Sequence, residues 1–354
     1  MNLSKQQEEI VTTAANKVVV IASAASGKTA VLVERVRYLL DNGADPKKVV
    51  LITFTNAAAE ELAERLGRPK GLFIGTIHSY ANYLLLSNGN DTQDIIEEEQ
   101  FDRLFNRIKH NPDCLRPVDH LLLDESQDSN EAHFEFLLDM VQPKNYIIMG
   151  DHKQSIYRWN GAYPDYLINL AKDPMVTTYS LDENYRNASN ILTFAKNIIM
   201  VAGYDYRDTS TPMRGVSGKV IPDLEYNPQS IARTFAQMKD GYGDWFILTR
   251  TNAQIDEIAS VLKRYGVPYD TFKRAQLDNK ELNKKMKENT VKVLTIHTAK
   301  GLEANNVIVI GAKFYNLEER CISYVAATRA RNMLIWTKMP YKKETRFSTT
   351  NWEK

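Results

Sequence analysis

Short runs of apolar and β-branched residues alternate with longer amphipathic stretches through the first half of the chain. The runs cover residues 17–21, 49–54, 72–76, 118–123 and 146–149. Runs of this kind are typical of strands buried on both faces, and the helical stretches between them are long enough to connect parallel strands. The first half is therefore expected to fold as an α/β domain around a parallel sheet.

A second series of such runs fills the other half. It begins at residues 176–181 and continues at 245–248, 291–296, 307–310 and 334–336. Because 354 residues exceed what one hydrophobic core usually supports, we expect two domains, at residues 1–180 and 181–354. A polar helical stretch at residues 91–111 indicates a small helical insertion in the first domain, within residues 81–118.

Composition excludes several classes of protein. Apolar residues make up 43% of the chain, which indicates a folded globular protein and not a disordered one. The 45 Lys and Arg balance 44 Asp and Glu, so nucleic acid could bind only through a local basic groove. No apolar run approaches the ~18 residues that span a membrane. Cys114 and Cys321 lie far apart without a histidine cluster, which argues against disulfides and zinc and favours the reducing cytoplasm.

A candidate phosphate-binding loop follows the first predicted strand. Residues 22–29 read Ala-Ser-Ala-Ala-Ser-Gly-Lys-Thr and precede a predicted helix over 27–40. Backbone N–H groups at such a helix N-terminus bind phosphate, with Lys28 at the β- and γ-phosphates and Thr29 at Mg²⁺. Ala22 stands where the usual pattern has its first glycine, and only Gly27 remains. An ordinary Ser/Ala-rich turn is the alternative interpretation.

Two carboxylates follow another predicted strand. Asp124 and Glu125 come directly after the apolar residues 121–123. At the carboxyl end of a strand in the same sheet as the phosphate loop, Asp124 is placed to bind Mg²⁺ and Glu125 to orient an attacking water. For such a pair seen alone, a solvated loop is the alternative.

Further motifs follow in an order that resembles the superfamily 1A DNA helicases of the UvrD/PcrA/Rep type, with a phosphate loop closer to that of the AddA branch. The motifs lie at residues 3–7, 52–59, 75–78, 124–128, 150–162, 183–186, 248–254, 293–303 and 324–330. The resemblance implies two RecA-like domains of the P-loop NTPase class, each with a parallel central sheet. It also implies that ATP and Mg²⁺ bind in the cleft between them.

The same resemblance implies which residues bind the nucleotide. Gln7 would read the adenine edge, Tyr185 would stack on the adenine and Glu303 would hold the ribose. The expected nucleotide-binding set is Gln7, Ala22, Ser23, Ala24, Ala25, Ser26, Gly27, Lys28, Thr29, Ala30, Tyr185, Gly301 and Glu303.

Catalysis of phosphoryl transfer needs cations that reach the γ-phosphate from outside the phosphate loop. By resemblance, Arg186 and Arg329 in the second half would act as arginine fingers from across the cleft, and Gln154 would contact the γ-phosphate. The expected catalytic set is Lys28, Asp124, Glu125, Gln154, Arg186 and Arg329, with Thr29 and Asp124 as metal ligands.

The resemblance also implies a path for single-stranded DNA, for which stacking aromatic rings and polar donors are suited. Phe54, Tyr157 and Trp159 occupy the stacking positions. The positions that contact the strand are Thr55, Asn56, Thr76, His78, Arg250, Asn252 and His297. A purely structural role for His78 and His297 stays open.

The expected function is an ATP-dependent DNA helicase or translocase that moves 3′ to 5′ on single-stranded DNA, including the tail of a duplex. We expect a cytoplasmic, monomeric motor of repair or replication. A translocase that needs a protein partner to open duplex, and a nucleotide-gated DNA-binding or sensing subunit, are the alternatives; RNA also stays open as substrate. The family's second large insertion is expected to be absent between residues 269 and 291, and Tyr341 is the candidate wedge.

Overall fold

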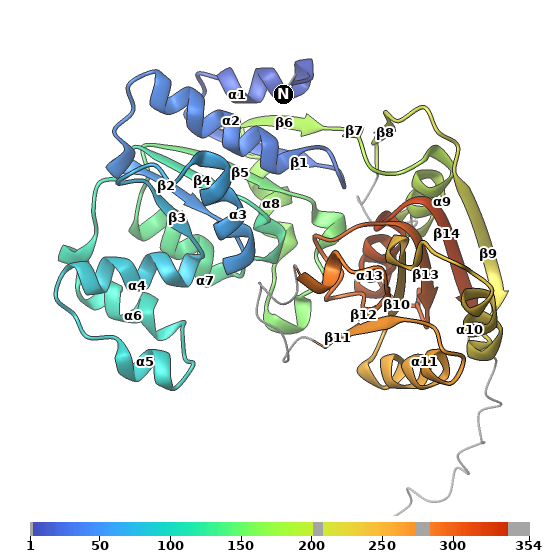
Figure 1. The fold of residues 1–354 in the computed structure, drawn as a ribbon. Coiled ribbons are helices and arrows are strands. Elements are labelled where there is room, and N and C mark those ends of the chain that lie inside the picture. The colour runs from blue at the N-terminus through green and yellow to red at the C-terminus, as the bar shows by residue number, and fades with distance from the viewer. Residues whose placement is uncertain (1–2, 201–207, 274–283, 339–354) are drawn as a thin grey trace, which may run out of the picture. The chain divides into compact units, whose positions relative to one another are not determined.

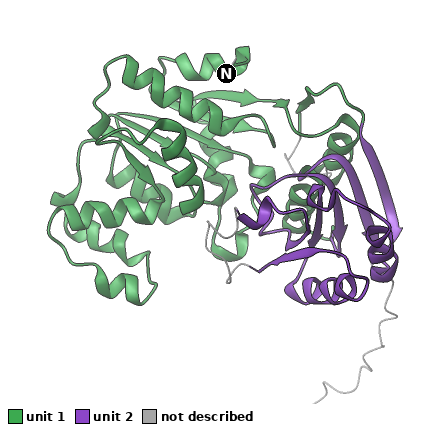
Figure 2. Cartoon of the chain, in the orientation of Figure 1, with its two compact units in different colours: residues 1–217, 314–328 green, residues 218–313, 329–354 purple. Residues whose placement is uncertain are grey.

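The chain forms two compact units, one of residues 1–217 and 314–328 and the other of residues 218–313 and 329–354 (Figure 2). The computed structural model describes residues 3–200, 208–273 and 284–338 (Figure 1). Each unit contains a six-stranded sheet in which neighbouring strands are parallel. The expected α/β class with two parallel sheets is confirmed.

The first sheet contains the five runs expected from the first half and one more strand. In spatial order its strands are β3 (Phe73–Gly75), β2 (Val49–Ile52), β4 (His120–Leu123), β5 (Asn145–Gly150), β1 (Lys17–Ala22) and β6 (Thr177–Leu181). All four residues of β2 are buried, as expected for a central strand of a sheet covered on both faces.

β6 corrects the expected start of the second domain. It runs beside β1, with Val20 opposite Tyr179, and closes one edge of the first sheet. Its residues are mostly exposed or half-buried, which an edge strand allows. An apolar run alone does not show which sheet it joins, and the units divide at 217/218 and not at 180/181.

Helices cover both faces of the first sheet. Alternate residues of β1 serve the two cores: Val18 and Val20 face one, Val19 the other. The first core is covered by α1 (Lys5–Thr12), α2 (Lys28–Asp41) and α3 (Asn56–Leu66). The second core is covered by α4 (Ile77–Ser87), α6 (Arg103–His110), α7 (Glu131–Phe134) and α8 (Pro164–Ala171).

The small helical insertion expected within residues 81–118 is present. It contains α5 (Gln93–Glu97), α6 and a short 3₁₀ turn at Pro112–Cys114. Leu104 and Ile108 of α6 are fully buried against the second core, so the insertion packs on the body of the first unit.

A late helix of the sequence returns to the first unit. α13 (Leu317–Thr328) packs against α9 (Ser189–Ile199) and against the 3₁₀ turn at His152–Gln154. The short strands β7 (Glu183–Asn184) and β8 (Thr211–Pro212) pair in the same unit. The segment after β6 therefore lies in the same compact unit as the phosphate loop.

The second sheet has strands that the sequence pattern missed at its two edges. In spatial order it contains β11 (Tyr269–Phe272), β12 (Val291–Thr295), β10 (Trp245–Thr249), β13 (Ala304–Ile310), β14 (Ala330–Lys338) and β9 (Lys219–Glu225). β9 has no buried residue and contains Pro222, so it lacks the apolar signature of a central strand. α10 (Pro228–Ala236) and α11 (Asn252–Arg264) contribute to the core of this unit.

Two expectations concern segments that lie largely or wholly outside the described residues. β11 and β12 are paired neighbours, and most of the chain between them lies outside the described residues, as does Tyr341.

Cys114 and Cys321 are free and buried. Within the described ranges, no helix has the length and apolarity needed to cross a bilayer.

Candidate active site and nucleic-acid interface

The expected catalytic residues of the first unit gather where three neighbouring strands end. β4, β5 and β1 are adjacent and parallel, so their carboxyl ends lie at one edge of the sheet (Figure 1). Residues 124–128 follow β4, residues 151–155 follow β5, and residues 23–27 follow β1. Open parallel sheets bind ligands at this edge.

The phosphate loop joins β1 to α2. Gly27 is the N-cap of α2 and has φ +83°, and a Cβ at this position would lie 2.6 Å from Gln7 Nε2. Ala25 also adopts the left-handed conformation, with φ +56°. Because that conformation costs an alanine about 1 kcal/mol, the loop holds Ala25 in a shape usually given to glycine.

Lys28 and Glu125 meet at this edge. Lys28 is buried in the first turn of α2, and its Nζ lies 3.8 Å from Glu125 Oε1. Asp124 directly follows β4 and is buried, with its Oδ1 accepting a hydrogen bond of 2.9 Å from the Glu125 N–H. The fold thus places a cation and two carboxylates together, as the motif spacing predicts.

Glu125 is held in a fixed conformation by Gln127. Glu125 has φ +50°, a left-handed conformation of the kind that often marks functional sites. Gln127 Nε2 donates to Glu125 Oε2, and Gln127 Oε1 accepts from the Asp151 N–H at 2.9 Å. Gln127 therefore connects the carboxylate after β4 to the segment after β5.

Asp151 organises the segment that contains Gln154. It is fully buried, with Lys153 Nζ 3.0 Å from its Oδ1 and Gln154 Nε2 2.8 Å from its Oδ2. Burial lowers the pKa of Lys153, but the charges of Asp151 and Asp208 outweigh burial and raise that pKa above its usual value. Lys153 is thus a buried, charged partner of Asp151.

Gln7 is joined to the phosphate loop. Its Nε2 donates to Ser26 O at 3.0 Å, and its Oε1 accepts from the Ser4 N–H at 3.0 Å. Ser4 and Gln7 form the capping box that begins α1. The structure therefore brings the first motif to the loop, and the adenine contact stays a proposal.

The position of Arg186 differs from expectation. It lies in the first compact unit, together with Lys28, because the segment after β6 bonds directly to the phosphate loop. The Tyr185 N–H donates to Ala25 O at 3.1 Å, and Arg186 Nη1 donates to Thr328 O at 3.4 Å. The expected domain boundary at residues 180/181 puts Arg186 in the second domain. The structure corrects this assignment, because Arg186 lies in the first unit.

Aromatic rings expected to stack on DNA form a group contributed by the segments that follow β2 and β5. Phe54 and Tyr157 are stacked with ring centroids 5.3 Å apart, and Tyr157 meets Trp159 edge-on at 6.4 Å. Tyr157 is only 7% exposed, whereas Trp159 is 65% exposed. Trp159 therefore offers the open ring surface, and Tyr157 supports it.

Two family models match the chain. That of the UvrD/REP helicase N-terminal domain matches residues 3–112 and 102–175, and that of the UvrD-like helicase C-terminal domain matches residues 270–341. The chain belongs to the UvrD/Rep family of superfamily 1A helicases. This membership confirms the expected class of enzyme, a DNA-dependent ATPase and helicase of the UvrD type, and agrees with two RecA-like domains.

Curated relatives carry helicase names. The chain is 25% identical to a probable DNA helicase of Mycoplasma pneumoniae, over 94% of this chain and 82% of that protein. It is 24% identical to the ATP-dependent DNA helicase PcrA of Leuconostoc citreum and 25% identical to the ATP-dependent DNA helicase Rep of Escherichia coli, each over 70% of this chain. It spans 46% and 51% of those two proteins, about half of their length.

Two helix N-termini of this UvrD-type chain lie at the edge where β2 and β3 end. Thr55 caps α3 by accepting from the Ala58 N–H at 3.2 Å, and Thr76 caps α4 by accepting from the Ser79 N–H at 3.2 Å. Asn56 is the exposed first residue of α3. Helix N-termini attract anions. This position is compatible with the expected contacts of Thr55, Asn56 and Thr76 to DNA phosphates, which stay proposals.

His78 contacts three side chains of the same unit. Its Nε2 lies 3.1 Å from Asp102 Oδ1, and its ring stacks on Phe105 at 5.3 Å and meets His133 edge-on at 5.0 Å. Burial, with a smaller effect of His78, lowers the pKa of His133 to about 4. These contacts favour a structural role for His78, the alternative left open by the sequence.

The other expected residues lie in the second unit. Arg329 is buried just before β14, and its Nη1 donates to Leu302 O at 3.2 Å. Glu303 accepts from Arg331 Nη1 at 2.8 Å, and Gly301 has φ +86°. The remaining residues follow the carboxyl ends of β10 and β12: Arg250, Asn252 and His297. Their roles stay proposals.

Sequence reasoning missed two buried asparagines, Asn184 and Asn187, that connect to the phosphate loop and to α13. Asn184 Nδ2 donates to Ala24 O at 2.9 Å and to Asn187 Oδ1 at 2.9 Å, and Asn187 Nδ2 donates to Thr328 O at 3.1 Å. Both asparagines are fully buried. Asn184 lies within the motif at 183–186 and Asn187 directly follows it, so the motif could have indicated them. The expected functional roles were given to their neighbours Tyr185 and Arg186.

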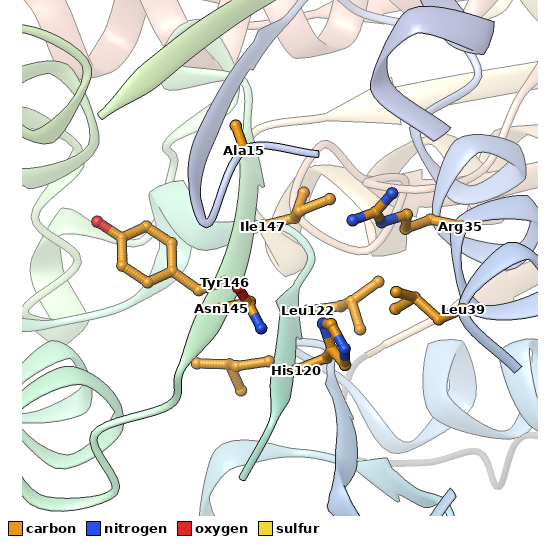
Figure 3. A pocket seen from close by; sticks show the side chains of 9 residues that line it. Ala15, Arg35, Leu39, His120, Leu122, Asn145, Tyr146 and Ile147 are labelled. Atoms are coloured by element: carbon orange, nitrogen blue, oxygen red, sulfur yellow. The ribbon is translucent and has the colours of Figure 1, made fainter. Parts of the chain in front are cut away.

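A small cavity at the opposite ends of the strands is not a ligand site. Its lining includes Arg35, His120 and Asn145, the last two being the first residues of β4 and β5 (Figure 3). The cavity has a volume of about 10 Å³, which holds about one water at most. Arg35 Nη1 donates to the carbonyls of Val11 and Thr13 at 2.7 and 2.9 Å, a structural use of a buried cation.

Proposed function

We propose that the chain is an ATP-driven motor that moves on single-stranded DNA. The observation that carries the proposal is the meeting of Lys28, Asp124 and Glu125 at the carboxyl edge of the first sheet, beside a phosphate loop. The aromatic group that ends in exposed Trp159 lies at the ends of strands of the same sheet and supports a single-stranded substrate.

The residues present fit Mg²⁺ and a triphosphate. Thr29 and Asp124 offer the oxygen ligands that Mg²⁺ prefers, and Lys28 is a buried cation at a helix N-terminus, where phosphate binds. Bound Mg²⁺ would neutralise charge on the phosphates. Glu125, oriented by Gln127, would position the attacking water, and Gln154 would contact the γ-phosphate.

Arg186 and Arg329 are proposed to supply further positive charge to the γ-phosphate. Tyr185 and Gln7 are proposed at the adenine, since both residues are hydrogen-bonded to the phosphate loop. Gly301 and Glu303 are proposed at the ribose. Arg186 belongs to the same compact unit as the loop, and Arg329 belongs to the other unit.

The finer properties of the motor follow from the family resemblance. We propose movement from 3′ to 5′, a monomeric motor and a cytoplasmic location, the last supported by two free, buried cysteines. A protein partner for opening duplex DNA is also proposed, as an alternative to a motor that opens duplex by itself. The relatives' helicase names favour a motor over a subunit that only binds DNA.

ATP hydrolysis measured without nucleic acid and with single-stranded DNA, RNA or duplex tests the proposal. The wild type should be stimulated most by single-stranded DNA. Lys28→Ala and Glu125→Gln should each lower the stimulated turnover by about 100-fold or more. Lys17→Ala, at the exposed opposite end of β1, is the matched control and should behave as wild type. Wild-type turnover in Lys28→Ala would defeat the assignment.

A further inference from the structure

Three potential metal ligands from separate elements of the first unit meet at a cavity of about 490 Å³. His78 lies in the first turn of α4, Asp102 immediately before α6, and His133 in α7. One ligand atom from each residue can be chosen so that all three lie within 4.8 Å of one another. All three residues line the cavity, which leaves room for a further ligand.

The three side chains already have part of a coordination geometry. His78 Nε2 and Asp102 Oδ1 are 3.1 Å apart, a separation suited to neighbouring ligands that each lie about 2 Å from one ion. His133 is 7% exposed, and its buried Nε2 has no hydrogen-bond partner. A buried polar atom without a partner is rare and indicates an unfilled interaction.

We propose that His78, Asp102 and His133 bind a Zn²⁺ ion. Two imidazole nitrogens and one carboxylate oxygen are one of the ligand sets of open zinc sites, in which water takes the fourth position. Mg²⁺ prefers oxygen ligands, so this site is chemically distinct from the proposed nucleotide site at Thr29 and Asp124.

Binding requires a change of protonation at His133. Its Nδ1 accepts a hydrogen bond of 3.2 Å from the Asn130 N–H, so in the metal-free protein the proton of the neutral ring lies on Nε2. Coordination through Nε2 moves that proton to Nδ1 and ends the bond to Asn130. The site thus exchanges one long neutral hydrogen bond, and the contact between His78 and Asp102, for three metal–ligand bonds.

The ion would connect the helical insertion to the body of the unit. Asp102 belongs to the insertion, whereas α4 and α7 pack on the second core of the first sheet. The exposed carboxylate of Asp102 is otherwise held only by its contact with His78 among the interactions the structure describes. Zinc should therefore raise the unfolding temperature of the whole chain, since it binds the folded state.

Calorimetric titration of the chelator-treated full chain with ZnCl₂ tests the proposal, with the visible absorption of Co²⁺ as a probe of the ligand set. We expect one Zn²⁺ per chain and no binding of Mg²⁺ at this site. His133→Gln should weaken Zn²⁺ binding by about 100-fold or more, yet it keeps the residue type that normally completes a capping box with Asn130. Asp102→Asn should weaken binding similarly.

The matched controls are His110→Asn and Asp113→Asn, two exposed residues of the same insertion. Both should bind Zn²⁺ as the wild type does, and circular dichroism should show that every variant is folded. Failure of the wild type to bind Zn²⁺, or unchanged binding in folded His133→Gln and Asp102→Asn, would overturn the proposal. Either result leaves the ATPase proposal intact, because that is measured with Mg²⁺ alone.

Discussion

Asp208 is a buried carboxylate that links three segments of the first unit. Its Oδ2 accepts from the Tyr324 hydroxyl at 2.6 Å, and its Oδ1 accepts from the Ser210 N–H at 2.9 Å. Burial raises the pKa of Asp208, but the charge of Lys153 and the hydrogen bonds outweigh burial, so the pKa lies below the usual 3.8. The ionised form is therefore the one that stabilises the fold.

Asp208→Asn should lower the free energy of unfolding by about 1.5–3 kcal/mol at pH 7, since hydrogen bonds to a charged group are lost. The folded pKa is depressed, so the contribution of Asp208 is complete above pH 3.8 and is lost as the pH falls through the folded value. Urea titrations at pH 7 and at pH 3 measure this difference. The difference in free energy of unfolding between wild type and Asp208→Asn should be smaller at pH 3 than at pH 7. The exposed control Asp113→Asn should unfold with the same free energy as the wild type. An equal difference for Asp208→Asn at both pH values would contradict the assignment.

Gln127 should affect catalysis through Glu125. Gln127→Ala removes the amide that holds Glu125 Oε2 and the Asp151 N–H. Because a catalytic group displaced by about 1 Å can lose about 100-fold in rate, kcat should fall by that order while KM for ATP changes little. Steady-state kinetics measure both values, with exposed Gln93→Ala as control. An increase in KM alone would show that Gln127 serves binding.

Residue positions near Lys28 could be predicted only in part. Asp124 and Glu125 follow a strand that is buried on both faces, and this pattern fixes the edge at which their side chains lie. Arg186 could not be placed, because whether the segment after β6 joins the first or second unit depends on long-range bonds such as that from Asn184 to Ala24. The His78, Asp102 and His133 group has no sequence spacing that reveals it.

At the scale of elements, the short 3₁₀ turn Arg158–Asn160 presents the aromatic surface of the proposed DNA path. Trp159→Ala removes this surface and leaves buried Tyr157 and half-buried Phe54 in place. Since base stacking contributes about 1–3 kcal/mol per base, the Kd for single-stranded DNA should rise about 5- to 150-fold, with unchanged ATP binding.

Fluorescence anisotropy with a labelled oligonucleotide measures the Kd for Trp159→Ala. Tyr83→Ala, an exposed aromatic residue of α4 outside the proposed path, is the control and should bind DNA as wild type. Equal affinity of Trp159→Ala and wild type would exclude stacking on this ring.

Strands were predicted where burial is symmetrical and missed where it is not. β1, β2 and β4 carry apolar residues on both faces, so their pattern is strong. β9 and β11 lie at sheet edges, and β9 has no buried residue. Their pairing comes from backbone hydrogen bonds to a neighbour, which depend little on residue type.

At the scale of the whole molecule, the chain passes between its two units three times, at 217/218, 313/314 and 328/329. The segment 314–328 thereby supplies α13 to the first unit. Tyr324 of this helix is fully buried and bonded to Asp208, and Thr328 O accepts from Asn187. The first unit is therefore incomplete when the chain stops at residue 217.

A fragment of residues 1–217 should be much less stable than one in which residues 314–328 are added through a flexible Gly/Ser linker. The shorter fragment exposes the face of α9 that α13 covers and leaves Asp208 and Asn187 without these partners. Thermal unfolding followed by circular dichroism compares the two fragments. Adding Tyr324→Phe to the linked fragment should remove part of the gain, because it deletes one buried hydrogen bond. Equal unfolding temperatures for the short and linked fragments would show that α13 is dispensable to the first unit.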